Sequence, residues 1–173
     1  MDDIQVIDNF LDEEYFKKLQ KIVSGRNFLW SRSCSPYDGF QFVHPIFLTL
    51  PSEPNFEEIR SPWFPEFLLC IKKLKVLSLM RIKANLLSRT EKRITHAHHV
   101  DVYEADCPNL KNAKTSILYM NTNNGITIFE DSKKEVESIA NRMAIFPITT
   151  RHTGTTNTDS GIPDRCVINF NYF

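Results

Sequence analysis

The spacing of apolar residues predicts a helical and loop-rich first part of the chain. A short apolar run at residues 4–7 is expected to form a strand. Apolar side chains then recur at helical spacing over residues 11–24, with charged residues between them and Gly25 directly afterwards, which predicts an amphipathic helix. A second, shorter helix is expected over residues 65–73. Between the helices, residues 27–55 mix aromatic side chains with turn formers, a pattern typical of short strands joined by loops.

From residue 76 onward the pattern is typical of half-buried strands. In the segment 76–87, Arg81, Lys83 and Asn85 alternate with apolar residues, so the polar side chains are expected to share one face of a strand. The pair Asn124-Gly125 predicts a type I′ hairpin, and a second hairpin is expected across Ala140-Asn141. The further strands are predicted at residues 94–103, 115–120, 126–129, 135–139, 142–146 and 165–173.

This order of elements indicates the fold class. Roughly eight strands after residue 76, with no predicted helix between them, favour antiparallel sheets closed into a jelly roll or barrel. We therefore expect a mainly β (α+β) protein with a single domain over residues 1–173. Residues 76–173 would form the jelly-roll core, and residues 1–75 would supply flanking helices and loops as a cover.

Composition and charge exclude several classes of function. The 21 basic and 21 acidic residues give a formal net charge of +0, so no bulk field favours nucleic acid or an anionic membrane. The most apolar segment, residues 64–80, is broken by charged side chains and is not expected to span a membrane. The acidic N-terminus leads into no apolar run, so no signal peptide is expected. No CxxC pair is present, and we expect reduced thiols in a cytoplasmic protein. The widely spaced cysteines are Cys34, Cys70, Cys107 and Cys166.

The candidate chemistry lies in the tripeptide His99-Val100-Asp101. Residues i and i+2 of a strand share a face, so the imidazole of His99 and the carboxylate of Asp101 are expected to point the same way, at a spacing suited to one metal ion. Only one histidine follows in the chain, His152. Two histidines and one carboxylate with open positions form the facial triad of non-haem iron(II) oxygenases. We therefore predict that His152 folds back beside His99 and Asp101.

Other interpretations of the histidines remain open at this stage. On a regular strand His96 and His98 would face away from His99, as ordinary polar residues. His96 and His98 with Glu104 and His152 loosely resemble the metal-binding pattern of cupins, although the spacing of Glu104 and the absent glycines fit poorly. His44 is interpreted as structural or as part of a substrate wall. A non-catalytic jelly-roll binding module is the alternative function.

Several motifs in order carry a resemblance to a known family. The chain has HxD at residues 99–101, Tyr-Met-Asn at 119–121, Gly125 in a segment ending in Phe129, Phe-Pro at 146–147, a distal histidine and a later arginine. This series resembles the iron(II)- and 2-oxoglutarate-dependent oxygenases, in particular the small prolyl-4-hydroxylase-like members of bacteria and phages. The resemblance covers residues 79–173, and residues 6–11 also look like the usual opening of the family.

The resemblance implies a double-stranded β-helix and a set of cofactors. His99, Asp101 and His152 would be the catalytic metal ligands for Fe(II), with 2-oxoglutarate and O2 as cosubstrates. Arg165, thirteen residues after His152, would bind the far carboxylate of 2-oxoglutarate through its guanidinium. Tyr119 matches a position that contacts the same carboxylate. Asn169, which shares the face of Arg165 on the last strand, is a further candidate for binding 2-oxoglutarate.

The implied reaction is hydroxylation of an unactivated C–H bond with release of succinate and CO2. A peptidyl proline, another protein side chain or a small molecule is the expected substrate, and the neutral net charge makes nucleic acid a less suitable one. Residues 27–47 and 104–114 are expected to form the substrate mouth. The family resemblance places the protein in the cytoplasm of a bacterium or of a phage-infected cell.

Overall fold

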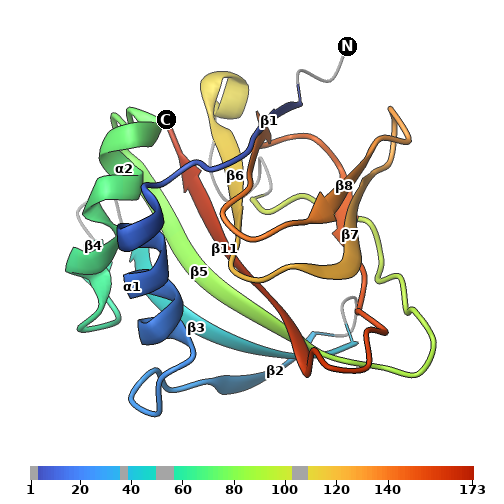
Figure 1. Cartoon of the computed structure of the whole chain (residues 1–173). Coiled ribbons are helices and arrows are strands. Elements are labelled where there is room, and N and C mark those ends of the chain that lie inside the picture. Colours follow the sequence, from blue (N-terminus) through green and yellow to red (C-terminus); the bar gives the residue numbers. More distant parts are fainter. Residues whose placement is uncertain (1–3, 36–38, 50–56, 103–108) are drawn as a thin grey trace.

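The computed structural model describes residues 4–35, 39–49, 57–102 and 109–173 (Figure 1). In this part of the chain, strands form one large and one small antiparallel sheet, and two α-helices lie against the outer face of the large sheet. The helices are α1 (Glu13–Val23) and α2 (Leu68–Leu74), with the 3-10 turns η1 (Phe64–Phe67) and η2 (Leu110–Asn112). None of these helices is long and apolar enough to cross a membrane.

The large sheet has eight strands in the order β1-β9-β6-β11-β5-β3-β2, with β4 paired to β3. The strands that precede α2 therefore extend the same sheet as those that follow it. Their bounds are β1 (Gln5–Ile7), β2 (Ser31–Ser35), β3 (Gly39–Thr49), β4 (Glu57–Ile59), β5 (Leu79–Ser88), β6 (Lys114–Tyr119), β9 (Met143–Pro147) and β11 (Asp164–Tyr172).

The small sheet faces the large one and has the order β10-β7-β8. Its strands are β7 (Asn123–Phe129), β8 (Glu135–Ser138) and β10 (His152–Gly154). Side chains from both sheets, among them Tyr119, Phe129 and Val167, form one buried cluster between them. Two facing antiparallel sheets confirm the predicted mainly β class with a jelly-roll core.

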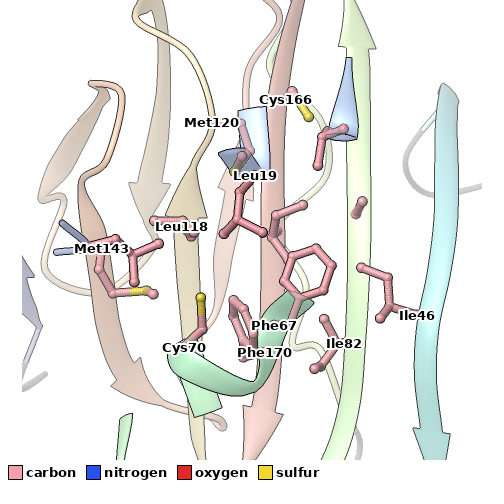
Figure 2. Close-up of a cluster of buried hydrophobic side chains, with 14 of the residues drawn as sticks. Leu19, Ile46, Phe67, Cys70, Ile82, Leu118, Met120, Met143, Cys166 and Phe170 are labelled. Carbon is pink, nitrogen blue, oxygen red and sulfur yellow. The ribbon is translucent and has the colours of Figure 1, made fainter. Parts of the chain in front are cut away.

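A second core fixes the helices to the outer face of the large sheet. Figure 2 shows Leu19 of α1 and Phe67 and Cys70 of the α2 region beside Ile82 and Phe170 of the sheet. Alternate residues of β5 and β11 enter this core, because successive side chains of a strand point to opposite faces. The remaining residues of the two strands, which include Arg81 and Arg165, point between the sheets. The outer core thus holds in place the strands that carry the site.

Of the four cysteines that are predicted to be reduced thiols, two have described side chains. Cys70 and Cys166 are free and buried, and burial raises the pKa of the Cys70 thiol to about 12. They are therefore protonated members of the core. Cys107 and the side chain of Cys34 lie outside the described residues.

The two predicted hairpins are wrong. β6 and β7, which flank the first, lie in different sheets, as do β8 and β9, which flank the second. A type I′ turn needs positive φ at both central residues, and neither Asn124 nor Gly125 has it. Asn124 and Gly125 instead lie in a bulge of β7. Asn141 does have positive φ (64°), but there the chain crosses between sheets, and its side chain bonds both backbone groups of Leu11.

The continuous strand predicted at residues 94–103 is also wrong within its described part, residues 94–102. Two isolated bridges, Thr95 to Thr155 and His99 to His152, connect this segment to β10 and the residue following it. Thr95 and His99 are four positions apart, whereas their partners Thr155 and His152 are three positions apart. The segment from Thr95 to His99 therefore contains one extra residue. An extra residue shifts the alternation of side chains, as in a β-bulge.

Candidate metal centre

Two histidines from distant parts of the chain are held opposite each other by backbone hydrogen bonds. The N–H of His99 donates to the carbonyl of His152 (2.9 Å), and the N–H of His152 donates to the carbonyl of His99 (3.0 Å). Directly opposed residues of an antiparallel pair carry their side chains on the same face. The ring centroids accordingly lie 5.0 Å apart.

Both imidazoles are oriented in the same way. Nδ1 of His99 lies 3.2 Å from the carbonyl oxygen of Ala97, and Nδ1 of His152 lies 3.1 Å from that of Thr150. An Nδ1–H that donates to a carbonyl leaves the lone pair on Nε2, the form of histidine that binds metals. Burial lowers the pKa of His152, which favours this neutral form.

The carboxylate of Asp101 completes the group. Potential ligand atoms of His99, Asp101 and His152 all lie within 4.8 Å of one another. The described part of the chain contains one group of this kind. Two neutral imidazoles and one carboxylate suit Fe(II), because they leave further coordination positions open. The donor set therefore fits the metal that the sequence predicts.

Asp101 is kept ionised by its neighbours. Burial alone raises the pKa of a carboxyl group, but here the positive charges of Arg81 and Lys83 and a hydrogen bond from Asn171 lower it well below its ordinary value. Nη2 of Arg81 lies 3.0 Å from Asp101 Oδ1, and Nδ2 of Asn171 donates to Oδ2 (3.0 Å). Asp101 is therefore a carboxylate, ready to bind a cation.

Arg165 supplies a buried positive charge near the small sheet. It is 4% exposed, and its guanidinium donates to Ser138 (2.8 Å) and Thr127 (2.9 Å). Burial lowers its pKa, while the described residues include no carboxylate that forms an ion pair with it. A buried arginine in this state is suited to bind an anionic ligand.

Glycines make room for this arginine. A Cβ on Gly125 would lie 2.6 Å from Cδ of Arg165, and a Cβ on Gly154 would lie 3.0 Å from Nη1. The bulge at Gly125, which sequence chemistry suggested was a turn, thus brings backbone close to the side chain of Arg165.

The triad and Arg165 line one cavity of about 80 Å³. The other lining residues include Gln41 of β3, Lys83 and Asn85 of β5, and Asn169 of β11. The Oδ1 atoms of Asn85 and Asn169 are buried and have no hydrogen-bond partner within the described residues, so a bound molecule has two polar atoms to satisfy. The cavity is therefore polar and built for a small ligand.

Sequence reasoning placed some of these residues and missed others. It predicted that His99, Asp101 and His152 converge and that Asn169 shares the face of Arg165. Gln41, Lys83 and Asn85 were not predicted as lining residues. The alternation in β5 gave the face of Lys83 and Asn85, but this signal does not say which side chains reach a cavity.

Tyr119 lies beside Arg165 and is not among the residues that line the cavity. Its ring packs against the guanidinium (5.6 Å to the centroid), and its hydroxyl donates to Thr127 (2.8 Å). Tyr119 and Arg165 thus share Thr127 as a partner. A direct contact of Tyr119 with a ligand remains a prediction.

The remaining histidines have different surroundings. His96 lines the same cavity as His99, so the prediction that it faces away is wrong, and the extra residue between the two bridges is the reason. His44 is within hydrogen-bond distance of the Leu29 carbonyl (2.6 Å) and Ser61 Oγ (2.7 Å), contacts that fit the structural alternative. Glu104 of the cupin-like alternative lies outside the described residues.

Comparisons with known proteins identify the fold. No protein-family model and no curated protein sequence matches the chain. Among solved structures, a 2OG-Fe(II) oxygenase family member from Burkholderia pseudomallei is similar with a TM-score of 0.72 and 10% identity, over 98% of this chain and 84% of that one. The viral collagen prolyl hydroxylase of Paramecium bursaria Chlorella virus 1 has a TM-score of 0.59 and 14% identity, over 97% and 94% of the two chains.

A third similar structure is HygX from Streptomyces hygroscopicus, solved with nickel and 2-oxoglutarate bound. It has a TM-score of 0.62 and 11% identity, over 98% of this chain and 82% of that one. At these identities the similarity establishes the fold. The chain has the fold of the 2OG-Fe(II) oxygenases, as its sequence motifs predicted.

Proposed function

We propose that this protein is an Fe(II)- and 2-oxoglutarate-dependent dioxygenase that hydroxylates an unactivated C–H bond, most like the prolyl-4-hydroxylases. One observation carries the proposal. Two histidines and an aspartate that suit Fe(II) line the same cavity as a buried arginine with no carboxylate partner in the described part of the chain. The fold shared with 2OG-Fe(II) oxygenases supports it.

Each residue would have a distinct role in binding. His99, Asp101 and His152 would hold the ferrous ion through Nε2 of each imidazole and one carboxylate oxygen. Arg165 would bind the far carboxylate of 2-oxoglutarate, while Ser138 and Thr127 keep its guanidinium in place. When bound, Fe(II) would supply the activation of O2, with 2-oxoglutarate converted to succinate and CO2 as one oxygen atom enters the substrate C–H bond.

The surroundings of the site would keep water away from the reaction. His152 is 3% exposed, and its ring packs edge-on against Phe146, with centroids 4.8 Å apart. Phe129 lies beside both rings, with its centroid 4.9 Å from that of Phe146 and 6.2 Å from that of His152. This aromatic wall is rigid and apolar, which suits an oxidant that must be directed at one bond.

The substrate would enter at a mouth formed by residues 27–47 and 104–114, of which residues 36–38 and 104–108 lie outside the described part of the chain. Gln41, within the first of these segments, lines the cavity. A cavity of about 80 Å³ is small, so a cosubstrate would occupy most of it and the substrate would lie over the opening. A peptide or a small molecule, presented from outside, is the proposed substrate class.

The proposal is tested by succinate formation. Protein supplied with Fe(II), 2-oxoglutarate and O2 should release succinate, and Asp101→Ala should abolish this release. Arg165→Ala should require a much higher concentration of 2-oxoglutarate, whereas Arg142→Gln, which removes an arginine that pairs with Asp8 away from the cavity, should behave as wild type. Proline-containing peptides and small molecules are then screened by mass spectrometry for the gain of one oxygen atom. Wild-type protein that forms no succinate under any of these conditions would refute the proposal.

A further inference from the structure

We propose that Arg81 is a positioning residue for the metal ligand Asp101: together with Asn171 it sets the direction of the carboxylate, and its own charge sets the donor strength. This inference rests on the proposed function, because it takes Asp101 as a ligand of the ferrous ion. It adds to that function a residue from β5, whose side chain contacts Asp101 and is not among those that line the cavity.

The backbone around Asp101 does not by itself hold the carboxylate. Asp101 lies two residues beyond the bridge at His99 and outside the strands of the described chain. The prediction of a regular strand would have placed its side chain by backbone pairing alone. Since the structure has no such strand there, side-chain contacts have to fix the carboxylate.

Three side chains form a closed ring that does so. Arg81 Nη2 lies 3.0 Å from Asp101 Oδ1, and Arg81 Nε donates to Asn171 Oδ1 (2.8 Å). Asn171 Nδ2 in turn donates to Asp101 Oδ2 (3.0 Å). Oδ1 of the carboxylate therefore forms an ion pair with Arg81, Oδ2 accepts a hydrogen bond from Asn171, and Arg81 and Asn171 also bond each other.

The ring is anchored on the most central strands of the large sheet. Arg81 on β5 and Asn171 on β11 are direct partners in the sheet register. Asn171 also pairs with Thr115 on β6 and donates to its hydroxyl (2.9 Å). Three adjacent strands thus determine where the ring lies. The carboxylate is therefore held in place by side chains of a sheet, although its own backbone is irregular.

The chemistry of the ring requires an arginine. A carboxylate has about four lone-pair positions, so the contacts from Arg81 and Asn171 still leave a position for a metal ion. The guanidinium forms the ion pair with Asp101 through Nη2 and donates to Asn171 through Nε, and the single ammonium of lysine does not reproduce this pair of contacts. The side chain of Asp101 is 4% exposed and that of Arg81 22%, so solvent screens their attraction only in part.

This positive charge has a consequence for the metal. An arginine that withdraws electron density from the carboxylate makes it a weaker donor, and the bound ion retains more of its own positive charge. Without Arg81, a ferrous ion would be more electron-rich, and its charge-transfer band with a chelated 2-oxo acid would move to lower energy. A purely structural arginine would change the amount of folded protein and not the position of this band.

The test uses four variants of the full chain and two measurements, the affinity for Co(II) and the visible band of the anaerobic Fe(II)–2-oxoglutarate complex. Arg81→Gln should weaken Co(II) binding about tenfold or more, in line with other residues that orient metal ligands, and should move the band to lower energy. Arg81→Lys keeps the charge, so it should keep the band position but lose affinity. Asn171→Ala should also lose affinity without a band shift. Arg142→Gln, which breaks a similar arginine–aspartate pair elsewhere, should change neither measurement.

Failure of this inference alone is distinguishable from failure of the proposed function. Wild-type affinity and an unmoved band in Arg81→Gln would refute the role of Arg81 while the wild-type band still supports the oxygenase. Wild-type protein with neither Co(II) binding nor a band would refute both. If Arg81→Gln does not fold, wild-type affinity for Co(II) in both Arg81→Lys and Asn171→Ala would refute the role.

Discussion

Replacing Gly125 with alanine should impair 2-oxoglutarate binding while metal binding persists. The new Cβ would lie 2.6 Å from Cδ of Arg165 and 2.9 Å from Oδ1 of Asn123, both well inside ordinary contact distance. Arg165 has little freedom to move away, because its backbone is part of β11 and its guanidinium donates to Ser138 and Thr127. The alanine therefore has to displace the guanidinium from at least one of these partners.

The magnitude follows from the hydrogen bonds of the guanidinium. A hydrogen bond from a charged group contributes about 1.5–3 kcal/mol, so removing one that is correctly placed should raise the Kd for 2-oxoglutarate roughly ten- to a hundredfold. The strain should also lower the free energy of unfolding by about 1–3 kcal/mol. The affinity of Co(II) for the apoprotein should stay at the wild-type value, because the displaced side chain is not one of the proposed ligands.

The assay is calorimetric titration of Co(II)-loaded protein with 2-oxoglutarate under anaerobic conditions. Gly161→Ala is the matched control, since a Cβ at Gly161 meets nothing within 4 Å and its φ is not in the left-handed region. Gly125→Ala protein that is folded and binds 2-oxoglutarate as tightly as wild type would refute the assignment of Arg165 as the carboxylate-binding residue.

Three further predictions concern stability. Asn141→Ala should lower the free energy of unfolding by about 2–4 kcal/mol, because it removes two hydrogen bonds to Leu11 and places alanine at positive φ. Urea denaturation measures this loss, and a value below about 1 kcal/mol would contradict the prediction. Phe170→Ala should cost about 3–5 kcal/mol in the same assay but leave Co(II) affinity unchanged, because Phe170 lies in the core beneath the helices. Burial lowers the pKa of His152, so the unfolded chain binds a proton at higher pH than the folded one. The apoprotein should therefore lose stability as pH falls below about 6.5 toward the folded pKa, by at most about 1.4 kcal/mol per pH unit for this residue. His152→Gln should remove this part of the slope, and an unchanged slope would refute it.

The sequence predicted the faces of strands better than the connections between them. Alternation in β5 correctly grouped Arg81 with Lys83, and alternation in β11 grouped Asn169 with Arg165, because period two is a property of each strand by itself. The hairpin prediction at Asn124-Gly125 failed because the preference of these residues for a turn is a local property. The sheet that β7 joins depends instead on partners far along the chain. The same glycine proved to be required by Arg165.

The metal ligands were predictable for a similar reason, and their supports were not. His99 and Asp101 are two residues apart, and His152 was the one histidine left to join them, so sequence alone could bring the three together. The ring of Arg81 and Asn171 around Asp101 depends on the register between β5 and β11, which no single segment encodes. His96 reached the cavity through one extra residue in an irregular segment, which alternation does not foresee.

The most direct test of the central claim is an anaerobic titration of the apoprotein with Fe(II) and 2-oxoglutarate, followed by visible spectroscopy. A ferrous ion held by His99, Asp101 and His152, with 2-oxoglutarate chelated to it and bound by Arg165, should give a weak charge-transfer band. The band should vanish in Asp101→Ala and require far more 2-oxoglutarate in Arg165→Ala. Wild-type protein that binds neither the ion nor the 2-oxo acid would contradict the account and favour a non-catalytic jelly-roll binding module.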